Sequence, residues 1–373
     1  EALFVGGQRG EWAAVRLSPT ARLEPTRLDQ GAPVRRIAFD STGTRVASAG
    51  WDGRVVIWDA VTRQPIRELH VFDSGKQAEQ PLWSPDDRIL AVSGTDGTIR
   101  FLEPNSGSEI GRTKEVVGGL WSIAWHSRLP RIASSSPDGV VRIWDTETFA
   151  EVRSLPQGYV VEQVDWHPTE DLLAMAKGDV GIIDPFANEY RSHLEGRSGL
   201  FFDCRFHPTE PWIAGAESNG FVKVWNYRER KVEGELRDFR EPARGIAWTP
   251  NHESLAIAYG DGKIRIWHLP SKSVVLTLDN PHQSGAAASL WWLAFSPDGD
   301  ELWASNHGGS ILIYDLGEQP TDGRAPSASA LPSSPHSTVG TNVDRAFGPH
   351  FTAGLERQAT KIARERVVGQ SDR

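Results

Sequence analysis

The sequence predicts an all-β fold made of a ring of four-stranded antiparallel sheets. One pattern of about 26 residues recurs seven times between residues 34 and 315. The position that ends the pattern recurs at intervals of 44, 42, 39, 42, 42 and 47 residues. Since a period near 42 residues is the length of one four-stranded propeller blade, the chain is predicted to be a seven-bladed β-propeller.

Each copy contains two apolar, mostly aromatic anchor positions. The first precedes the second by 19 residues in six copies, and by 17 in the contracted copy that ends at Asp184. The second anchors are Trp58, Trp144, Trp225, Trp267 and Tyr314, with Leu102 and Ile183 in the two weaker copies. We expect the five aromatic second anchors to lie inside the blades as structural anchors.

The local pattern of one copy fits four strands. Residues 34–39 alternate as a strand does, a turn follows, and residues 45–50 and 54–58 form two more alternating runs. Asp52-Gly53 between these runs is a strong hairpin signal, because both central residues of a type I′ turn need positive φ. A fourth run follows at residues 64–72. Such sheets must stack on neighbours to bury both faces, which closes a ring.

Two copies end in Trp-Asp, at Trp58-Asp59 and Trp144-Asp145. In this respect the chain resembles the WD-repeat family, and the resemblance covers residues 1–315. The family's structural tetrad of Asp, His, Ser or Thr, and Trp is partly present, as Asp52, Ser48 and Trp58 in the first copy and Asp138, Ser134 and Trp144 in the third. The Gly-His dipeptide that supplies the histidine is missing from the sequence. The departures imply weaker hydrogen bonding inside blades and a divergent, bacterial member.

Residues 1–30 align with the back half of a repeat and begin without methionine, so we expect a piece of a longer protein. In family rings an N-terminal strand completes the last blade. Residues 21–28 are therefore expected to pair with the strand that carries Tyr314, which removes an open sheet edge. Alternatively, the hairpin at residues 2–17 belongs to an eighth blade or to upstream repeats.

The composition changes after residue 315. Residues 316–353 are rich in Pro, Ser and Gly and are interpreted as a linker. Residues 354–368 place apolar side chains on one helical face, which predicts a short amphipathic helix before the tail to residue 373. This helix either packs on the ring or docks on a partner.

Charge and composition exclude several classes of function. The net charge of −9 argues against general affinity for nucleic acid or anionic lipid. No apolar run approaches the roughly 18 residues of a membrane span. The single cysteine, Cys204, fits a reducing compartment. We therefore expect a monomeric ring in the cytoplasm that binds neither nucleic acid nor membrane.

Candidate chemical groups have structural explanations. His126, His167 and His207 replace the Ser of an SPDG-type turn, and Cys204 occupies an apolar alternation point of an inner strand. No HExxH, CxxC or paired His–carboxylate spacing suggests a metal site. The inward-facing cluster of His, Asp or Glu that propeller enzymes carry is not recognisable. We predict no catalytic residue, no metal and no cofactor.

One set of positions is not explained by core packing. Four residues before each first anchor lie Arg35, Glu79, Trp121, Glu162, Phe202, Arg244 and Trp291. They are expected at the channel rim, on the face reached by the hairpin turns, together with Trp51 of the exposed turn GWDG. WD-repeat proteins bind partners on this face, and Trp and Arg are enriched at interface hot spots. The alternative is that the tryptophans cover the ends of the blade cores.

The function that follows is a non-enzymatic scaffold for protein–protein interaction. It would bind a peptide segment or a partner domain at the channel rim, as the sensor or docking part of a larger signalling protein. The alternative is a propeller enzyme acting on a small molecule at the channel mouth. Convergent carboxylates or histidines in a pocket would favour the enzyme, and a flat rim with exposed aromatic residues would favour the scaffold.

Overall fold

The computed structural model describes residues 3–6, 12–15, 24–187, 189–196, 199–281 and 284–316. The chain divides into two compact units, Glu1–Glu318 and Gln319–Arg373, and all described residues lie in the first. The predicted linker, apart from Leu316, and the predicted helix at residues 354–368 lie outside the described residues.

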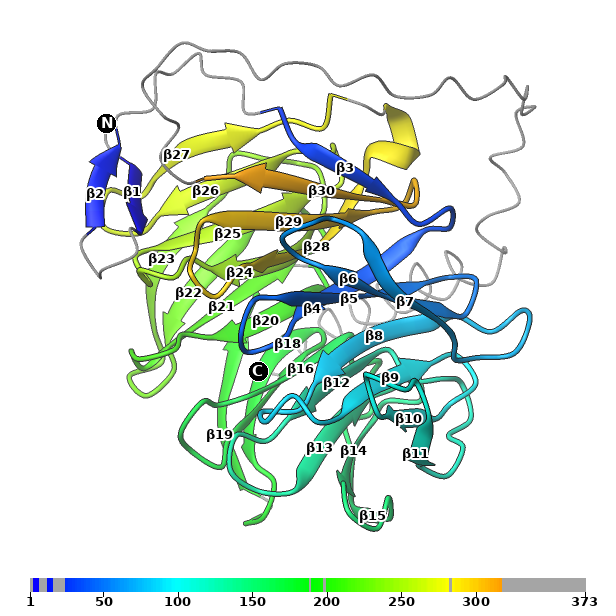
Figure 1. Cartoon of the computed structure of the whole chain (residues 1–373). Coiled ribbons are helices and arrows are strands. Elements are labelled where there is room, and N and C mark those ends of the chain that lie inside the picture. The colour runs from blue at the N-terminus through cyan, green and yellow to red at the C-terminus, as the bar shows by residue number, and fades with distance from the viewer. Residues whose placement is uncertain are drawn as a thin grey trace, which may run out of the picture. The chain divides into compact units, whose positions relative to one another are not determined.

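Seven four-stranded antiparallel sheets form the blades (Figure 1). Blade one consists of β4 (Val34–Phe39), β5 (Arg45–Gly50), β6 (Arg54–Asp59) and β7 (Pro65–His70). Blade two consists of β8 (Ala78–Trp83), β9 (Leu90–Gly94), β10 (Ile99–Leu102) and β11 (Glu109–Arg112). Blade three consists of β12 (Ser122–Trp125), β13 (Arg131–Ser135), β14 (Val140–Asp145) and β15 (Glu151–Pro156). Blade four consists of β16 (Gln163–Trp166), β17 (Leu173–Ala176), β18 (Asp179–Asp184) and β19 (Glu189–Glu195).

Blade five consists of β20 (Phe201–Phe206), β21 (Trp212–Glu217), β22 (Val222–Asn226) and β23 (Lys231–Leu236). Blade six consists of β24 (Ala243–Trp248), β25 (Ser254–Tyr259), β26 (Ile264–His268) and β27 (Ser273–Leu278). Blade seven consists of β28 (Leu290–Phe295), β29 (Glu301–Asn306), β30 (Ser310–Asp315) and β3 (Thr26–Asp29). One 3-10 turn, Gly285–Ala288, precedes β28.

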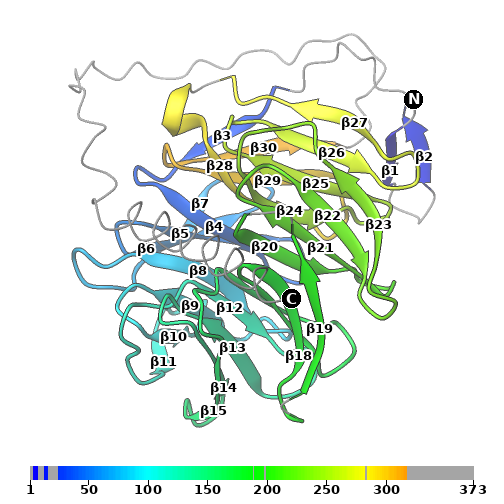
Figure 2. The same ribbon diagram turned by 180° about the vertical axis from the view of Figure 1, so that it is seen from behind.

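The seventh blade is completed by an N-terminal strand. β3 pairs antiparallel with β30, with Thr26 opposite Ile313 and Asp29 opposite Ser310. Figures 1 and 2 show β3 beside β30 from both sides. The strand begins later than the segment 21–28 predicted to take this place. Among the described residues, β1 (Leu3–Gly6) and β2 (Trp12–Val15) pair only with each other, so the ring has seven blades and the eight-bladed alternative is wrong.

The hydrophobic core lies between adjacent blades, because each sheet has two apolar faces. Trp267 and Tyr259 of blade six pack with Val222 of blade five, and Tyr314 of blade seven packs with Ile264 of blade six. The innermost strands are neighbours around the ring, and β28 packs against β4 to close it. All five aromatic second anchors are buried.

Hydrogen bonds inside the blades follow part of the expected tetrad. The Trp58 indole N–H donates to the Ser48 hydroxyl at 2.8 Å, and the Trp144 indole does the same to Ser134 at 2.9 Å. In blade one the Ser48 hydroxyl donates to the Gln30 side-chain carbonyl at 2.5 Å. Gln30 thus extends the network by one hydrogen bond, while its own Nε2 is buried without a hydrogen-bond partner among the described residues.

The two aspartates of the tetrad serve the hairpin turns. Asp52 accepts the backbone N–H of Arg54 and pairs with its guanidinium at 2.6 Å. Asp138 accepts the N–H of Val140 and pairs with Arg142 at 2.6 Å. Gly53 beside Asp52 has φ of 81°, and a Cβ there would lie 2.8 Å from the Lys76 carbonyl oxygen. Only glycine fits this turn without strain.

Candidate functional site

The rim positions are set by a repeated irregularity of the innermost strands. The pairing of the first and second strands shifts by one residue in five blades. The extra residues are Arg35, Glu79, Phe202, Arg244 and Trp291. A β-bulge of this kind bends the strand and re-aims a side chain. The other two positions, Trp121 and Glu162, directly precede β12 and β16.

One group of rim residues meets across blades one, two and seven. Arg35 Nε lies 3.2 Å from Glu79 Oε2, and the Arg35 guanidinium lies 5.0 Å from the centre of the Trp291 ring. Trp291 in turn packs on Trp51, with ring centres 4.9 Å apart. His307 contacts both indoles edge to face, at 5.0 Å and 5.5 Å. Sequence reasoning missed His307, which follows β29.

A second group lies around Arg244. Its guanidinium is 5.5 Å from the centre of the Phe202 ring, and it has no ion pair among the residues that the structure describes. Its Nε is buried without a hydrogen-bond partner there. Burial, reinforced by the charge of Arg35, lowers the pKa of Arg244 to about 10. Glu162 is buried near the same arginines, and burial raises its pKa to about 7. The positive charges of Arg35, Arg36 and Arg244 act against this rise, because they favour the ionised carboxylate.

The rim residues differ in exposure. Glu79, Glu162 and Trp291 are only 4%, 7% and 6% exposed. Trp51 was expected in an exposed turn but is half-buried, because it packs on Trp291 and His307. The Trp291 indole is buried among Trp51, His307 and the Arg35 guanidinium. The partly exposed residues that remain, Arg35, Trp51, Trp121, Phe202 and Arg244, are called the rim surface below.

A charged layer that sequence reasoning missed follows directly below the rim. Arg36 donates to Gln80 Oε1 at 2.9 Å and to the Trp121 carbonyl oxygen. Arg205 lies 3.2 Å from Asp165 and 3.3 Å from Asp203. Polar residues within the runs VEQVDW and FFDCRF were the available signal, because a packed inner strand would carry apolar residues there.

Trp292 connects the two arginines of this layer. The Arg36 and Arg205 guanidinium groups lie 4.6 Å and 4.5 Å from the centre of its ring. Cations over an indole face gain electrostatic stabilisation, most of all where water is excluded. The side chains between the inner strands therefore include paired charges and are not purely apolar.

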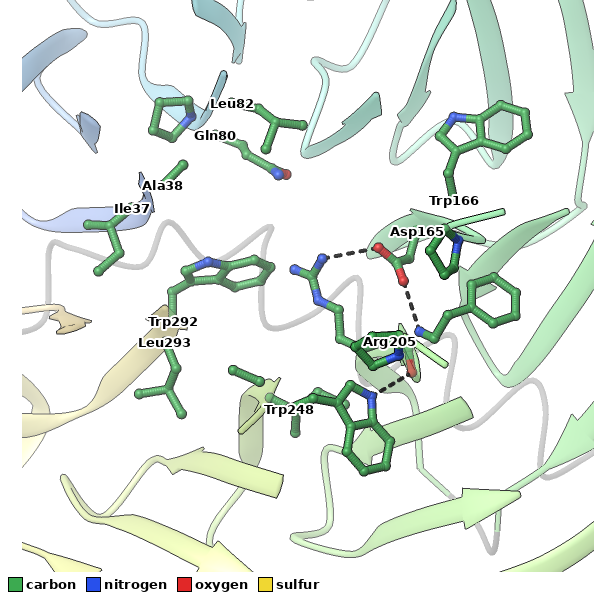
Figure 3. A pocket seen from close by; sticks show the side chains of 16 residues that line it. Ile37, Ala38, Gln80, Leu82, Asp165, Trp166, Arg205, Trp248, Trp292 and Leu293 are labelled. Atoms are coloured by element: carbon green, nitrogen blue, oxygen red, sulfur yellow. Dashed lines mark hydrogen bonds and ion pairs between the residues drawn. The ribbon is translucent and has the colours of Figure 1, made fainter. Parts of the chain in front are cut away.

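A cavity of about 380 Å³ lies at the other end of the innermost strands (Figure 3). Its lining includes Ala38 and Leu82 near the ends of β4 and β8, and Pro168 and Pro208 from the following turns. Figure 3 shows Gln80, Trp292, Arg205 and Asp165 converging on one part of it. Burial raises the pKa of Asp165 to about 6, against the opposing charge of Arg205.

The three turn histidines have the structural role predicted for them. In each, Nδ1 accepts two backbone N–H groups of its own turn, at 2.9 to 3.2 Å. Their Nε2 atoms bond to other blades: His126 to Asp171, His167 to the Tyr227 hydroxyl, and His207 to the His252 carbonyl oxygen. Burial lowers the pKa of all three.

Other candidates of the sequence have simple surroundings. Cys204 is fully buried, and burial raises its pKa well above the usual value. Within the described ranges, no group of three or more His, Cys, Asp or Glu side chains is placed to hold a metal ion. The same part of the chain contains no helix of the length and apolar character that a membrane span requires.

Comparison with known proteins shows similarity to WD40 families over parts of the chain. The family described as "WD domain, G-beta repeat" matches residues 24–59, 78–101 and 112–145. The first of these matches begins just before β3, so it joins the closing strand to the three inner strands of blade one. These three stretches are therefore similar to WD40 repeats. A second family, described as "Anaphase-promoting complex subunit 4 WD40 domain", matches residues 206–293.

Several known proteins are similar to more than half of this chain. Human "Pre-mRNA-processing factor 17" is 24% identical over 247 residues, which are 63% of this chain and 42% of that protein. "Cell division cycle 20.6, cofactor of APC complex" of Arabidopsis thaliana is 22% identical over 318 residues, 83% of this chain and 64% of that protein.

The rat "Serine-threonine kinase receptor-associated protein" is 24% identical over 237 residues, 61% of this chain and 65% of that protein. The chain thus spans about 42% to 65% of the length of these three relatives. The relatives are eukaryotic, so the expectation of a bacterial member is not borne out. The comparisons also give no support to the expectation of a piece of a longer protein.

Proposed function

We propose that this chain is a non-enzymatic platform for protein–protein interaction, and that its rim surface binds a peptide segment carrying an acidic residue. The three relatives described above are named as a factor, a cofactor and an associated protein. Cytoplasmic location and a role in signalling belong to the same proposal. The lone, buried Cys204 is in keeping with a reducing compartment.

The observation that carries the proposal is the electrostatic situation of Arg244. Arg35 is neutralised by Glu79 at 3.2 Å, whereas Arg244 has no ion pair among the described residues. A partly buried cation without a partner is costly, and a carboxylate from a ligand would relieve that cost. Guanidinium–carboxylate hydrogen bonds are roughly twice as strong as neutral ones. An Asp or Glu side chain is therefore the group that we assign to Arg244.

The aromatic side chains of the rim surface, of which Phe202 lies beside Arg244, suggest the rest of the ligand. Trp51, Trp121 and Phe202 are all half-buried, so each offers part of a ring to a partner while the remainder packs on the propeller. Large, partly pre-ordered aromatic groups contribute much contact area at low entropic cost, and Trp is enriched at hot spots. The preferred segment would place apolar side chains next to its acidic residue.

Glu162 makes the proposed site sensitive to pH. Because the pKa of this carboxyl is raised to about 7 by burial, Glu162 gains a proton as the pH falls through that value. Protonation removes a negative charge from the neighbourhood of Arg244. An acidic ligand should then bind more tightly below about pH 7 than above it.

The carboxylates near the cavity give little support to the enzyme alternative. Asp165 and Asp203 both converge on Arg205. Asp165 also accepts the Phe206 backbone N–H at 2.8 Å, and Asp203 accepts that of Ile246 at 3.0 Å. These bonds use the carboxylates to hold neighbouring inner strands together, which favours a platform over a catalyst.

Selection from a phage library of random peptides tests the proposal. The immobilised chain should enrich peptides with an acidic residue beside apolar ones, and these should bind Arg244→Gln at least tenfold more weakly, about 1.4 kcal/mol. Glu210→Lys, in the exposed turn after β20 on the opposite face, is the charge-changing control and should bind like wild type. Enrichment of peptides without acidic residues, or equal binding by Arg244→Gln, would refute the proposal.

A further inference from the structure

We propose that the cavity of about 380 Å³ is a second binding site, which takes a small neutral molecule with a carboxamide group on an apolar body. The site shares no residue with the rim surface and does not rest on the function proposed for it. Its volume lies in the range of small-molecule pockets, roughly 300–1,000 Å³.

The polar end of the cavity offers one donor and one acceptor side by side. The Arg205 and Asp165 side chains remain 22% and 19% exposed although they pair with each other, so polar atoms of both face the cavity (Figure 3). Arg205 uses Nη1 for Asp165 and Nε for Asp203, while its Nη2 has no hydrogen-bond partner within the described residues. Arg205 can thus donate to a ligand carbonyl, and Asp165 can accept from the adjacent N–H.

The charge balance of this end selects a neutral ligand. Arg36 and Arg205 contribute two positive charges around Trp292, and Asp165 and Asp203 contribute two negative ones. An added carboxylate would approach Asp165, and an added cation would approach Arg205. Either would introduce an uncompensated charge beside a balanced set of four charges. A carboxamide presents the required acceptor and donor without net charge.

The remaining wall is apolar and suits the body of such a ligand. Leu82, Trp248 and Leu293 line the cavity, together with Pro168 and Pro208 of the turns. Trp248 is fixed by donation of its indole N–H to the Arg205 carbonyl oxygen at 3.4 Å, and Figure 3 shows its ring beside the polar group. An aromatic or aliphatic body of a few carbon atoms would replace water on this wall, which is favourable.

The same chemistry could come from a free small molecule or from a glutamine or asparagine side chain of a peptide. Benzamide, benzoate and benzamidine have nearly the same shape and are neutral, negative and positive, so they isolate the effect of charge. N-acetylglutamine methylamide and N-acetylglutamate methylamide form the matching pair for a peptide side chain. Binding of all five to the full chain is measured by saturation-transfer NMR and calorimetric titration.

We expect a neutral amide to bind at least tenfold more tightly than its charged counterparts. Benzamide binding would identify a free ligand, and binding of the glutamine derivative alone would identify a peptide side chain. Ala38→Leu, which fills the cavity without changing its polar end, should abolish binding, and Arg244→Gln should leave it unchanged. If Ala38→Leu lowers the thermal midpoint, Ala247→Val serves instead, since Ala247 lines the same cavity.

Three results would overturn the inference. The first is equal binding of a charged and a neutral probe, and the second is no binding of any probe at millimolar concentration. The third is unchanged binding in a cavity-filling variant that folds normally. None of these bears on the rim surface, whose test uses Arg244→Gln and a different ligand.

Discussion

Arg35 and Glu79 form an ion pair across the first strands of blades one and two, with Nε and Oε2 3.2 Å apart. The pair commits one of the two rim arginines to the propeller itself. Arg244, the other, is 5.5 Å from the Phe202 ring and has no ion pair among the described residues. Loss of Arg35 should therefore lower mainly the stability of the propeller, and loss of Arg244 should weaken mainly the binding of the acidic ligand.

Arg35→Gln should lower stability more than Arg244→Gln does. Loss of Arg35 leaves Glu79, which is only 4% exposed, without its charge partner, and breaking a buried pair costs up to about 3–5 kcal/mol. Because Arg35 itself is partly exposed, we expect the lower part of this range. Urea unfolding midpoints of the two variants check the prediction. A larger loss of stability in Arg244→Gln than in Arg35→Gln would contradict the prediction, because it would show that Arg244 has a stabilising partner within the propeller.

Trp51→Ala should destabilise the propeller moderately. Its ring packs on Trp291 at 4.9 Å and on His307 at 5.5 Å, but it is only half-buried. We expect about 1–2 kcal/mol, compared with about 3–5 kcal/mol for Trp144→Ala in the core. The two variants are compared by denaturant unfolding. Equal losses would mean that the turn carrying Trp51 is part of the core.

Removal of the closing strand should open the ring. Deletion of residues 1–30 removes β3, whose Leu28 is buried in the core beside Trp303, and exposes the edge of β30. We expect a thermal midpoint several degrees lower, or aggregation. Deletion of residues 1–23 is the control and should leave the midpoint unchanged. If both deletions behave alike, the pairing of β3 with β30 does not stabilise the ring.

His207 should make the propeller sensitive to acid. Burial lowers its folded pKa below the unfolded value of about 6.5, while Nδ1 accepts two N–H groups and Nε2 donates to the His252 carbonyl oxygen. The unfolded chain then binds more protons between these two pKa values. This contribution is present above about pH 6.5 and is lost as the pH falls toward the folded pKa.

The thermal midpoint of wild type should therefore fall more steeply from about pH 7 to about pH 5 than that of His207→Asn. Asparagine keeps an oxygen that can accept the turn N–H groups but does not titrate. Comparison with the variant is needed because Glu162, whose folded pKa is raised, acts in the opposite direction. Parallel pH curves for the two proteins would exclude His207 as the source.

The repeat pattern was sufficient for the fold, because strands, hairpin turns and anchors are local features. Asp52-Gly53 and the spacing to Trp58 specify a blade from the residues of that blade alone. The closing strand could also be predicted, since a half-repeat before the first copy implies a partner for β30. The Gln30–Ser48 hydrogen bond could not, because Gln30 follows β3 of blade seven and Ser48 lies in β5 of blade one, so the contact depends on how the two blades pack.

The rim was predicted as a set of positions but not as an environment. Side chains of different blades meet where the innermost strands converge. The sequence of a single repeat does not specify how its blade is oriented toward the others. Trp51 and Trp291 are far apart in the sequence yet in contact, and Glu162 is buried among arginines of other blades. The bulges that re-aim Arg35 and Arg244 likewise depend on pairing with the second strand.

The central claim is that Arg244 receives an acidic side chain of a partner at the rim surface. The most direct measurement is the affinity of a selected acidic peptide for wild type and Arg244→Gln, titrated calorimetrically on both sides of about pH 7. The account predicts at least tenfold weaker binding to Arg244→Gln, and weaker binding to wild type above the pKa of Glu162 than below it. Equal affinity for both proteins at every pH would contradict it.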